Sequence, residues 1–314
     1  MPRRLRPPPD RVRRLAPSGR FPRPLGGAGT IKIDAHTHIF PPDVVASRER
    51  LFARDPFFRE LYQNPRARMA SAEQLVAELD AAGFDAAVAC GWGWTDHALC
   101  VEQNDYLIEA VGRFPDRIIG FAAIQPAAGE RALREAERAL KAGLGGIGEL
   151  MPHGQGYQLD QSQEGTRLLA PLAELAVGLG VPILTHTSEP VGHVYPGKGN
   201  VTVQTVVNLA TAFPELKLIC GHWGGGLLFY ELMKEVAAAL TNVYYDTAAS
   251  PYLYDPRIYR AASILAGPEK VLFGSDYPLL RIARCERQVI DAALPAAETE
   301  RILGGNAARL LGLG

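Results

Sequence analysis

Residues Ile33-Asp34-Ala35-His36-Thr37-His38-Ile39-Phe40, which read IDAHTHIF, place two histidines two positions apart behind an aspartate. Alternate side chains of an extended strand share one face, so we expect Asp34, His36 and His38 to point the same way. Two imidazoles about 7 Å apart along one strand can hold one ion between them, given bonds of about 2.1 Å. Two ordinary polar residues at a strand end would give the same pattern, so the motif alone does not establish a metal site. Further donors elsewhere in the chain are needed.

Similar apolar runs, rich in Val, Ile and Phe, recur after residue 31, and each is followed by a longer segment with helical periodicity. This pattern is typical of repeated βα units. The expected strands are residues 31–38, 85–93, 117–126, 145–152, 181–188, 216–223, 242–248 and 270–278. Eight parallel strands covered by helices close most economically as an α/β fold of the (β/α)8 TIM barrel type. An open doubly wound sheet is the alternative, but no GxGxxG follows the first strand.

The clearest expected helix spans residues 71–82. Ser71 and Gln74 have the spacing of a capping box at its start, and Gly83 follows as a stop signal. Two connections are long, and long loops inside compact domains are often binding loops or lids. The further expected helices are residues 129–143, 164–180 and 227–240, and the long connections are residues 39–70 and 189–199.

Composition divides the chain at residue 30. Residues 1–30 hold eight arginines, seven prolines and a single acid, Asp10, which predicts a disordered extension before one barrel domain over residues 31–314. An interaction arm, a weak transit peptide and an upstream start of the reading frame are its alternative explanations. The remaining 25 basic and 33 acidic residues give the body a net charge of −8. Such a body repels phosphate backbones, so no nucleic-acid partner is expected unless the extension binds one.

The chain has the composition of a soluble protein with a large core, because 47% of its residues are hydrophobic and 21% are charged. It has no apolar run of about 18 residues, so we expect no membrane span. Four cysteines lie far apart with no CxxC pair, which predicts reduced core thiols in a cytoplasmic protein. They are Cys90, Cys100, Cys220 and Cys285.

Polar side chains mark the ends of most expected strands, and these ends meet at one mouth of a barrel. They are Glu149, His186, His222, Asp246 and Asp276, in the expected strands four to eight. A divalent ion needs several imidazoles or carboxylates on a rigid frame. The sequence therefore predicts a metal site with His36, His38, His186 and Asp276 as ligands, and Glu149 could bridge to a second ion.

These motifs resemble, in order along the chain, the amidohydrolase superfamily. The matching segments are DAHTH (34–38), GIGEL (146–150), ILTHTS (183–188), ICGHWGG (219–225), FGSDYP (273–278) and GGNAARLLGL (304–313). More narrowly they are similar to its amidohydrolase-related branch, which includes aminocarboxymuconate-semialdehyde decarboxylase and resorcylate-type decarboxylases beside many hydrolases. The resemblance covers residues 31–314.

The resemblance implies that His36, His38, His186 and Asp276 bind a divalent metal, usually Zn²⁺, with Mn²⁺ as the alternative. It also implies that His222 polarises or protonates the substrate. Glu149 stands where hydrolytic branches carry a carboxylated lysine or a glutamate, so one ion is expected and a second is permitted. The presence of Glu149 favours hydrolysis.

We therefore expect a metal-dependent hydrolase of a small molecule with an ester, lactone or amide carbonyl. The ion would lower the pKa of its bound water from about 15.7 to about 7. Asp276 would take the proton of that water, and His222 would stabilise the oxyanion. Asp246 would orient a histidine or have a structural role alone.

The alternative is a carboxy-lyase, a metal-dependent non-oxidative decarboxylase of an unsaturated or aromatic acid. Asp276 or His222 would protonate carbon, and Lys198, Arg66 or Arg68 would bind substrate carboxylates. A metal-dependent deoxyribonuclease is disfavoured because the body is acidic and the expected mouth has no basic cluster. A scaffold without activity is disfavoured because every expected ligand position is filled.

Aromatic residues near the expected mouth could wall a pocket for a planar ligand, or could be rim packing. The predicted substrate-binding residues are Trp92, Trp94, Lys198 and Trp223, with Tyr277 beside Asp276 as a further aromatic. A homodimer is an expectation that rests on the resemblance alone.

Overall fold

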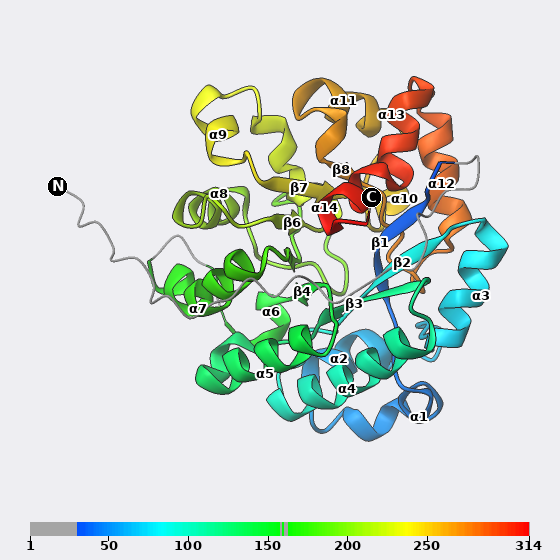
Figure 1. The fold of residues 1–314 in the computed structure, drawn as a ribbon, viewed down its shortest axis with the longest axis vertical. Helices are drawn as coiled ribbons and strands as arrows, with labels where there is room; N and C mark the ends of the chain where they lie inside the picture. The colour runs from blue at the N-terminus through cyan, green and yellow to red at the C-terminus, as the bar shows by residue number, and fades with distance from the viewer. Residues whose placement is uncertain (1–29, 158, 160–162, 314) are drawn as a thin grey trace.

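The computed structural model describes residues 30–157, 159 and 163–313. The predicted extension over residues 1–30 lies outside the described residues except for Thr30. Eight strands form one sheet in chain order, and every neighbouring pair is parallel, which confirms the predicted barrel (Figure 1). The strands are β1 (Ile33–His38), β2 (Ala86–Cys90), β3 (Ile118–Ala122), β4 (Gly146–Leu150), β5 (Ile183–Thr185), β6 (Leu218–Cys220), β7 (Val243–Asp246) and β8 (Val271–Leu272).

The barrel closes between β1 and the segment that follows β8. The His38 amide donates to the Tyr277 carbonyl at 2.7 Å, and the Asp276 amide donates to the His36 carbonyl at 2.9 Å. β8 itself is two residues long, shorter than the predicted residues 270–278. The chain beyond it nevertheless runs alongside β1, so Asp276 reaches the neighbourhood of both histidines.

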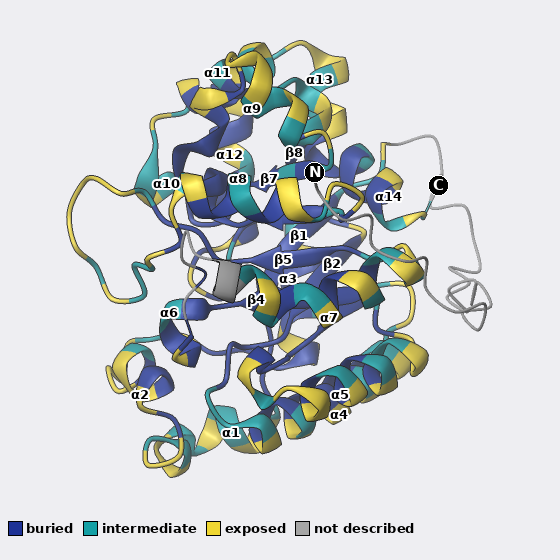
Figure 2. Cartoon of the chain, turned by 90° about the vertical axis from the view of Figure 1, so that its left-hand side faces the viewer, coloured by how far each residue is buried: buried dark blue, intermediate teal, exposed yellow. Residues whose placement is uncertain are grey.

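Two apolar layers lie on the two sides of the strands. One cluster fills the barrel interior, with α14 (Asn306–Leu311) at its base, and draws residues from six strands. Its members include Ile33, Val88, Phe121, Leu184, Ile219 and Leu272. A larger cluster joins the outer faces of the strands to the surrounding helices. In Figure 2 the strands are buried, whereas the outer faces of helices such as α4 and α5 are exposed.

The helices surround the strands, and most of them follow a strand as the βα pattern predicts. The longer ones are α3 (Ala72–Ala82), α4 (His97–Arg113), α5 (Glu130–Lys141), α7 (Gln163–Leu179), α8 (Val203–Ala212), α11 (Arg257–Leu265) and α12 (Ile282–Asp291). The shorter ones are α1 (Pro42–Ala46), α2 (Pro56–Tyr62), α6 (Pro152–Gln155), α9 (Lys234–Ala239), α10 (Ser250–Leu253), α13 (Ala296–Glu300) and α14 (Asn306–Leu311). The 3-10 segments are Arg48–Leu51, Pro126–Ala128, His222–Tyr230 and Pro268–Lys270, and Arg301–Gly305 is a π-helical turn.

The predicted capping box of α3 is present. The Ser71 hydroxyl accepts from the Gln74 amide, the Gln74 side chain accepts from the Ser71 amide, and Gly83 ends the helix in the left-handed conformation. The helices predicted over residues 129–143 and 164–180 correspond to α5 and α7. Local sequence signals were sufficient at these positions.

The single helix predicted over residues 227–240 is wrong. A 3-10 segment over His222–Tyr230 and the separate α9 stand in its place. Trp223 and the three glycines that follow it, residues 224–226, all have positive φ angles between 59° and 85°. This left-handed run turns the chain sharply after β6, before the predicted helix begins. Met233, between the 3-10 segment and α9, has an extended backbone with φ −81° and ψ 114°, so a single helix cannot run through it.

The expectation that Asp34 shares a face with His36 and His38 is also wrong. The pairing of β1 with β2 shifts register between Asp34 and Thr37, which interrupts the alternation of side chains. The Asp34 carboxylate accepts from the backbone amides of His36 at 3.1 Å and Ser275 at 3.0 Å. Asp34 thus braces β1 against the segment after β8 and does not join the imidazoles.

The long connections differ in structure. Residues 39–70 contain α1, a 3-10 turn and α2, whereas residues 189–199 contain turns and bends alone. All four cysteines are buried and unpaired. Within the described ranges, we find no helix that combines the length and apolarity needed to cross a membrane.

Phe121 tests the filling of the barrel interior. Its ring is fully buried and packs against Gly146, where an added Cβ would lie 2.8 Å from ring atoms. We expect Phe121→Ala to lower the free energy of unfolding by about 3–5 kcal/mol, because it leaves a cavity. Chemical denaturation would measure the change. The control Phe229→Ala removes a half-exposed ring, and an equal loss in the two variants would contradict the placement of Phe121.

Candidate metal centre

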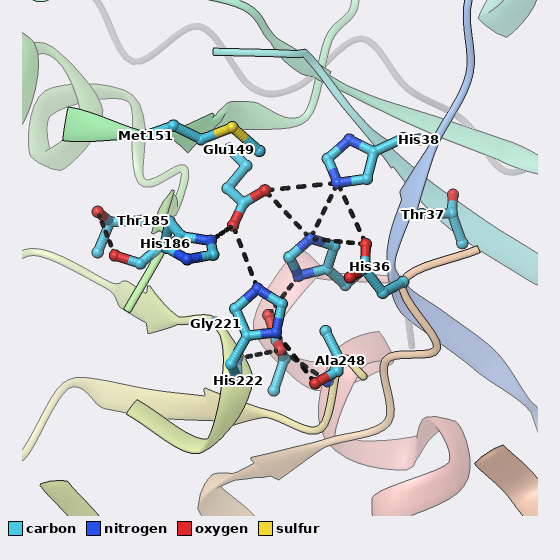
Figure 3. A network of polar contacts seen from close by, with 12 residues as sticks. His36, Thr37, His38, Glu149, Met151, Thr185, His186, Gly221, His222 and Ala248 are labelled. Atoms are coloured by element: carbon cyan, nitrogen blue, oxygen red, sulfur yellow. Dashed lines mark hydrogen bonds and ion pairs between the residues drawn. The ribbon is translucent and has the colours of Figure 1, made fainter. Parts of the chain in front are cut away.

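Four donor side chains converge at one end of the barrel, and Figure 3 labels three of them, His36, His38 and Glu149. The His36 and His38 Nε2 atoms, both from β1, lie 3.2 Å apart. Glu149 Oε2, from β4, lies 3.4 Å from each of them. Asp276 Oδ1, after β8, lies 3.5 Å from His38 Nε2 and 4.0 Å from His36 Nε2.

These separations fit one divalent ion. Two donors bound to one ion by bonds of about 2.1 Å, at angles of about 90–110°, lie about 3.0–3.4 Å apart. Three of the distances above, 3.2, 3.4 and 3.4 Å, lie within that range. Imidazole and carboxylate donors together suit first-row divalent metals. The residues present therefore fit a divalent metal.

Asp246, at the end of β7, fixes the orientation of His36. Its Oδ2 lies 2.8 Å from His36 Nδ1, and its Oδ1 accepts from the backbone amides of His222 and Ala248 at 3.0 Å each. Burial raises the pKa of the Asp246 carboxyl, but the charge and hydrogen bond of His36 outweigh that effect and lower it. The carboxylate therefore accepts a hydrogen bond from Nδ1 and turns Nε2 toward the other donors, so that Nε2 can bind an ion once it has lost its proton.

Glu149 is the acidic centre of the cluster. Burial alone would raise the pKa of its carboxyl, but His36 and the hydrogen bonds of neighbouring histidines lower it well below the ordinary value. Gly148 has a φ of 133°, and a Cβ there would lie 2.4 Å from the Leu184 carbonyl oxygen. Glycine is thus required for β4 to approach β5 closely enough to place Glu149 in the site.

His186 lies beside the four donors. Its Nδ1 is 2.9 Å from Glu149 Oε1, and its Nε2 is 3.1 Å from the Ser188 hydroxyl. Both ring nitrogens therefore face partners other than His36, His38 and Asp276. The role of His186 as a direct metal ligand stays a prediction, and the structure shows it as a hydrogen-bond partner of Glu149.

His222 directs a nitrogen into the site. A carbonyl oxygen can only accept a hydrogen bond, so His222 Nδ1 donates to the Ala248 carbonyl at 3.1 Å. The other ring nitrogen, Nε2, lies 3.7 Å from Glu149 Oε1. Burial lowers the pKa of His222, but the negative charges of Glu149 and Asp276 raise it overall to about 9. Both His222 and Asp276 have positive φ angles, 54° and 64°, which indicates backbone strain at these two positions.

A cavity of about 470 Å³ opens above the cluster. His38, Glu149, His186, His222 and Asp276 lie at its base. Its walls are mostly aromatic and apolar, and their members include Phe57, Tyr62, Trp92, Tyr195 and Tyr252. Such a shape suits a small, largely planar ligand with a polar group at one end.

Of the three tryptophans predicted to bind substrate, Trp92 lines the cavity. The Trp94 indole donates to Gln103 at 2.9 Å, and the fully buried Trp223 indole donates to Ser250 at 2.8 Å. Trp94 and Trp223 are outside the cavity lining. The structure therefore gives no support to substrate contact by these two residues, and that role stays a prediction.

The cationic residues predicted to bind substrate carboxylates differ in their position relative to the cavity. Lys198 donates to the carbonyls of Val191 and His193 at 2.8 and 3.2 Å, so it shapes its own loop and does not line the cavity. Arg68 lines the cavity, whereas Arg66 does not.

Several cavity residues were missed from the sequence, notably Phe57 and Tyr62 of α2. A local signal for α2 exists, because Asp55 caps the helix by accepting from the Phe58 amide at 2.7 Å and Pro56 follows at its first position. His153, after β4, also lines the cavity. We find no signal in the sequence that would have identified it.

Comparison with known proteins agrees with this geometry. A family model described as amidohydrolase matches residues 33–313. The chain belongs to the amidohydrolase family. This confirms the resemblance seen in the metal and strand-end motifs, and it identifies the protein as an enzyme of the amidohydrolase superfamily.

Relatives of this amidohydrolase are named as decarboxylases. The 2-amino-3-carboxymuconate-6-semialdehyde decarboxylase of Dictyostelium discoideum is 23% identical, over 90% of this chain and 92% of the relative. The gamma-resorcylate decarboxylase of Polaromonas sp. (strain JS666 / ATCC BAA-500) is 26% identical, over 67% of this chain and 75% of the relative.

Solved structures show the same fold. The 5-carboxyvanillate decarboxylase of Sphingomonas paucimobilis has a TM-score of 0.70 and 21% identity, over 90% of this chain and 99% of that one. A dihydroxybenzoic acid decarboxylase of Polaromonas sp. JS666, with bound manganese and the inhibitor 2-nitroresorcinol, has a TM-score of 0.69 and 20% identity. The match covers 91% of this chain and 98% of that one.

These relatives overturn the prediction of hydrolysis. They are decarboxylases, so the alternative stated from the sequence is better supported than the main prediction. Glu149 was a poor indicator because its carboxylate interacts with histidines of this one cluster and does not require a second ion. A divalent metal is supported, but zinc is not, since manganese is the ion bound in a similar structure.

The orienting role of Asp246 can be tested by metal binding. Asp246→Asn keeps the shape of the side chain but removes its charge, so the affinity for Mn²⁺ should fall by about 10- to 100-fold. Competition with a chelator would measure the dissociation constant. Asp116→Asn, at an exposed position, is the control and should match the wild type. Equal affinities in all three proteins would show that Asp246 does not orient a ligand.

Proposed function

We propose that this protein is a metal-dependent decarboxylase of an aromatic carboxylic acid. The observation that carries the proposal is the aromatic cavity directly above a buried cluster of metal donors. The decarboxylase names of its relatives support the same reaction class. The substrate is thus a small molecule with a planar apolar body and an anionic end.

The walls suit a ring. The Phe57 and Trp92 rings stack with centroids 5.7 Å apart at 19°, and Tyr62 meets Trp92 nearly edge-on at 5.2 Å. Aromatic faces and edges of this kind bind a planar ligand through the same stacked and edge-on contacts. Arg68 contributes a positive charge to the lining, which would attract an acid.

His36, His38, Glu149 and Asp276 would hold the metal in the proposed site, with His186 supporting Glu149. When bound, the ion would supply positive charge that binds and polarises oxygen atoms of the substrate. Mn²⁺ is the ion we favour, because two imidazoles and two carboxylates accommodate it and a similar decarboxylase structure contains it. One barrel domain over residues 31–314 and a homodimer remain proposals.

The proposed reaction breaks the bond between a ring carbon and the carboxylate carbon. The electron pair of that bond stays on the ring carbon, carbon dioxide leaves, and a proton is transferred to the same carbon. His222 is the proton donor in this scheme, because its Nδ1 is held by Ala248 and its Nε2 faces the cavity base. The apolar walls would exclude water that competes for the new carbanion.

Carbon dioxide release tests the proposal. Protein loaded with Mn²⁺ would be incubated with benzoates that carry hydroxyl or methoxyl groups, and with esters, lactones and amides. We expect carbon dioxide from at least one acid. His222→Gln should lower kcat by about 100- to 10,000-fold while metal content is retained, as removal of a general acid does.

His97→Gln, at the start of α4 and outside the cavity, serves as the control and should keep the wild-type rate. Turnover of a carbonyl substrate without release of carbon dioxide from any acid would refute the decarboxylase proposal. Full activity of His222→Gln would leave decarboxylation standing but would eliminate His222 as the proton donor.

A further inference from the structure

Tyr62 stands out among the cavity residues because its position is rigidly fixed. It is the last residue of α2, whose first turn is capped by the buried Asp55. Its ring packs against Phe40 at 5.5 Å, Phe58 at 4.7 Å and Trp92 at 5.2 Å between centroids. A side chain confined on several sides loses little conformational freedom when it binds a ligand.

The hydroxyl of Tyr62 has no hydrogen-bond partner among the described residues, although the side chain is 9% exposed and lines the cavity. Two other tyrosines, Tyr245 and Tyr106, have partners for their hydroxyls. The Tyr245 hydroxyl donates to Glu231 at 2.8 Å, and the Tyr106 hydroxyl accepts from the Ala72 amide at 2.8 Å. The Tyr62 hydroxyl is open to the cavity and forms no bond with the described residues, so it is free to donate to a ligand bound there.

Electrostatics make this hydroxyl a donor. Burial raises the pKa of Tyr62 above its ordinary value, and the negative charges of Asp276 and Glu149 raise it further. The phenol therefore keeps its proton at neutral pH. The two carboxylates act on it through space, yet neither forms a hydrogen bond with it.

We propose that the Tyr62 hydroxyl donates a hydrogen bond to a carboxylate oxygen of the substrate and so positions the acid over the metal donors. This inference rests on the proposed function, since it assigns a substrate contact within the same cavity. A donor to the carboxylate group selects acids over neutral ring compounds of the same shape. The ring of Tyr62 contacts the substrate ring, and its hydroxyl favours acids over neutral compounds of the same shape.

Binding of benzoate tests the inference without requiring turnover. Isothermal titration would measure the dissociation constants of benzoate and of neutral benzyl alcohol for the Mn²⁺-loaded wild type, Tyr62→Phe and Tyr157→Phe. Tyr157 is a matched control, because it is a buried tyrosine outside the cavity lining whose hydroxyl also lacks a partner among the described residues. Thermal unfolding of each variant would show whether it retains the fold.

Tyr62→Phe should weaken benzoate binding by about 10- to 100-fold, as expected for a lost hydrogen bond to a charged group. Its affinity for benzyl alcohol should stay within a factor of about three, and Tyr157→Phe should match the wild type for both ligands. Unchanged benzoate affinity in Tyr62→Phe, equal losses in both variants, or no benzoate binding by the wild type would each overturn the inference. If no acid releases carbon dioxide but the benzoate difference is found, the decarboxylase proposal alone fails.

Discussion

The hydrogen bond between His36 Nδ1 and Asp246 Oδ2, 2.8 Å long and fully buried, is the interaction on which the site depends. It joins β1 to β7 and turns His36 Nε2 toward His38, Glu149 and Asp276. The other Asp246 oxygen accepts two backbone amides, one of them from His222. One carboxylate therefore fixes the direction of a metal donor and the backbone of the proposed proton donor together.

The apolar core of the barrel offsets the energetic cost of burying this polar cluster. Buried carboxylates and imidazoles are costly unless they are paired, and here each lies near a partner of complementary character. The apolar interior beneath the cluster and the helices outside the strands supply the burial that stabilises the fold. A divalent ion would offset the negative charges of Glu149 and Asp276 and remove the unfavourable approach of two imidazole lone pairs.

Much of this arrangement could be predicted from the sequence. The eight strands follow from repeated apolar runs, and the donors at strand ends follow from the rule that parallel strands present their carboxyl ends at one mouth. Where prediction failed, the determinants are not local. The register shift beside Asp34 depends on pairing with β2, and the occupied nitrogens of His186 depend on the position of Ser188.

The reaction was the least predictable feature. Glu149 can serve a hydrolase or a decarboxylase, because its carboxylate interacts with the same histidines in either case. The cavity walls that suggest an aromatic acid come from segments far apart in the chain, such as α2 and the end of β2. Lys198 and Trp223 are near the site in sequence, yet their side chains point to partners within their own surroundings.

One divalent ion is proposed to bind to His36, His38, Glu149 and Asp276. Anomalous diffraction at the manganese absorption edge, from crystals of the protein grown with Mn²⁺, tests this proposal most directly. We expect one strong peak about 2.2 Å from Nε2 of His36 and His38, with carboxylate oxygens of Glu149 and Asp276 also bound. A peak held by other residues, or no peak among these four side chains in fully loaded crystals, would contradict it.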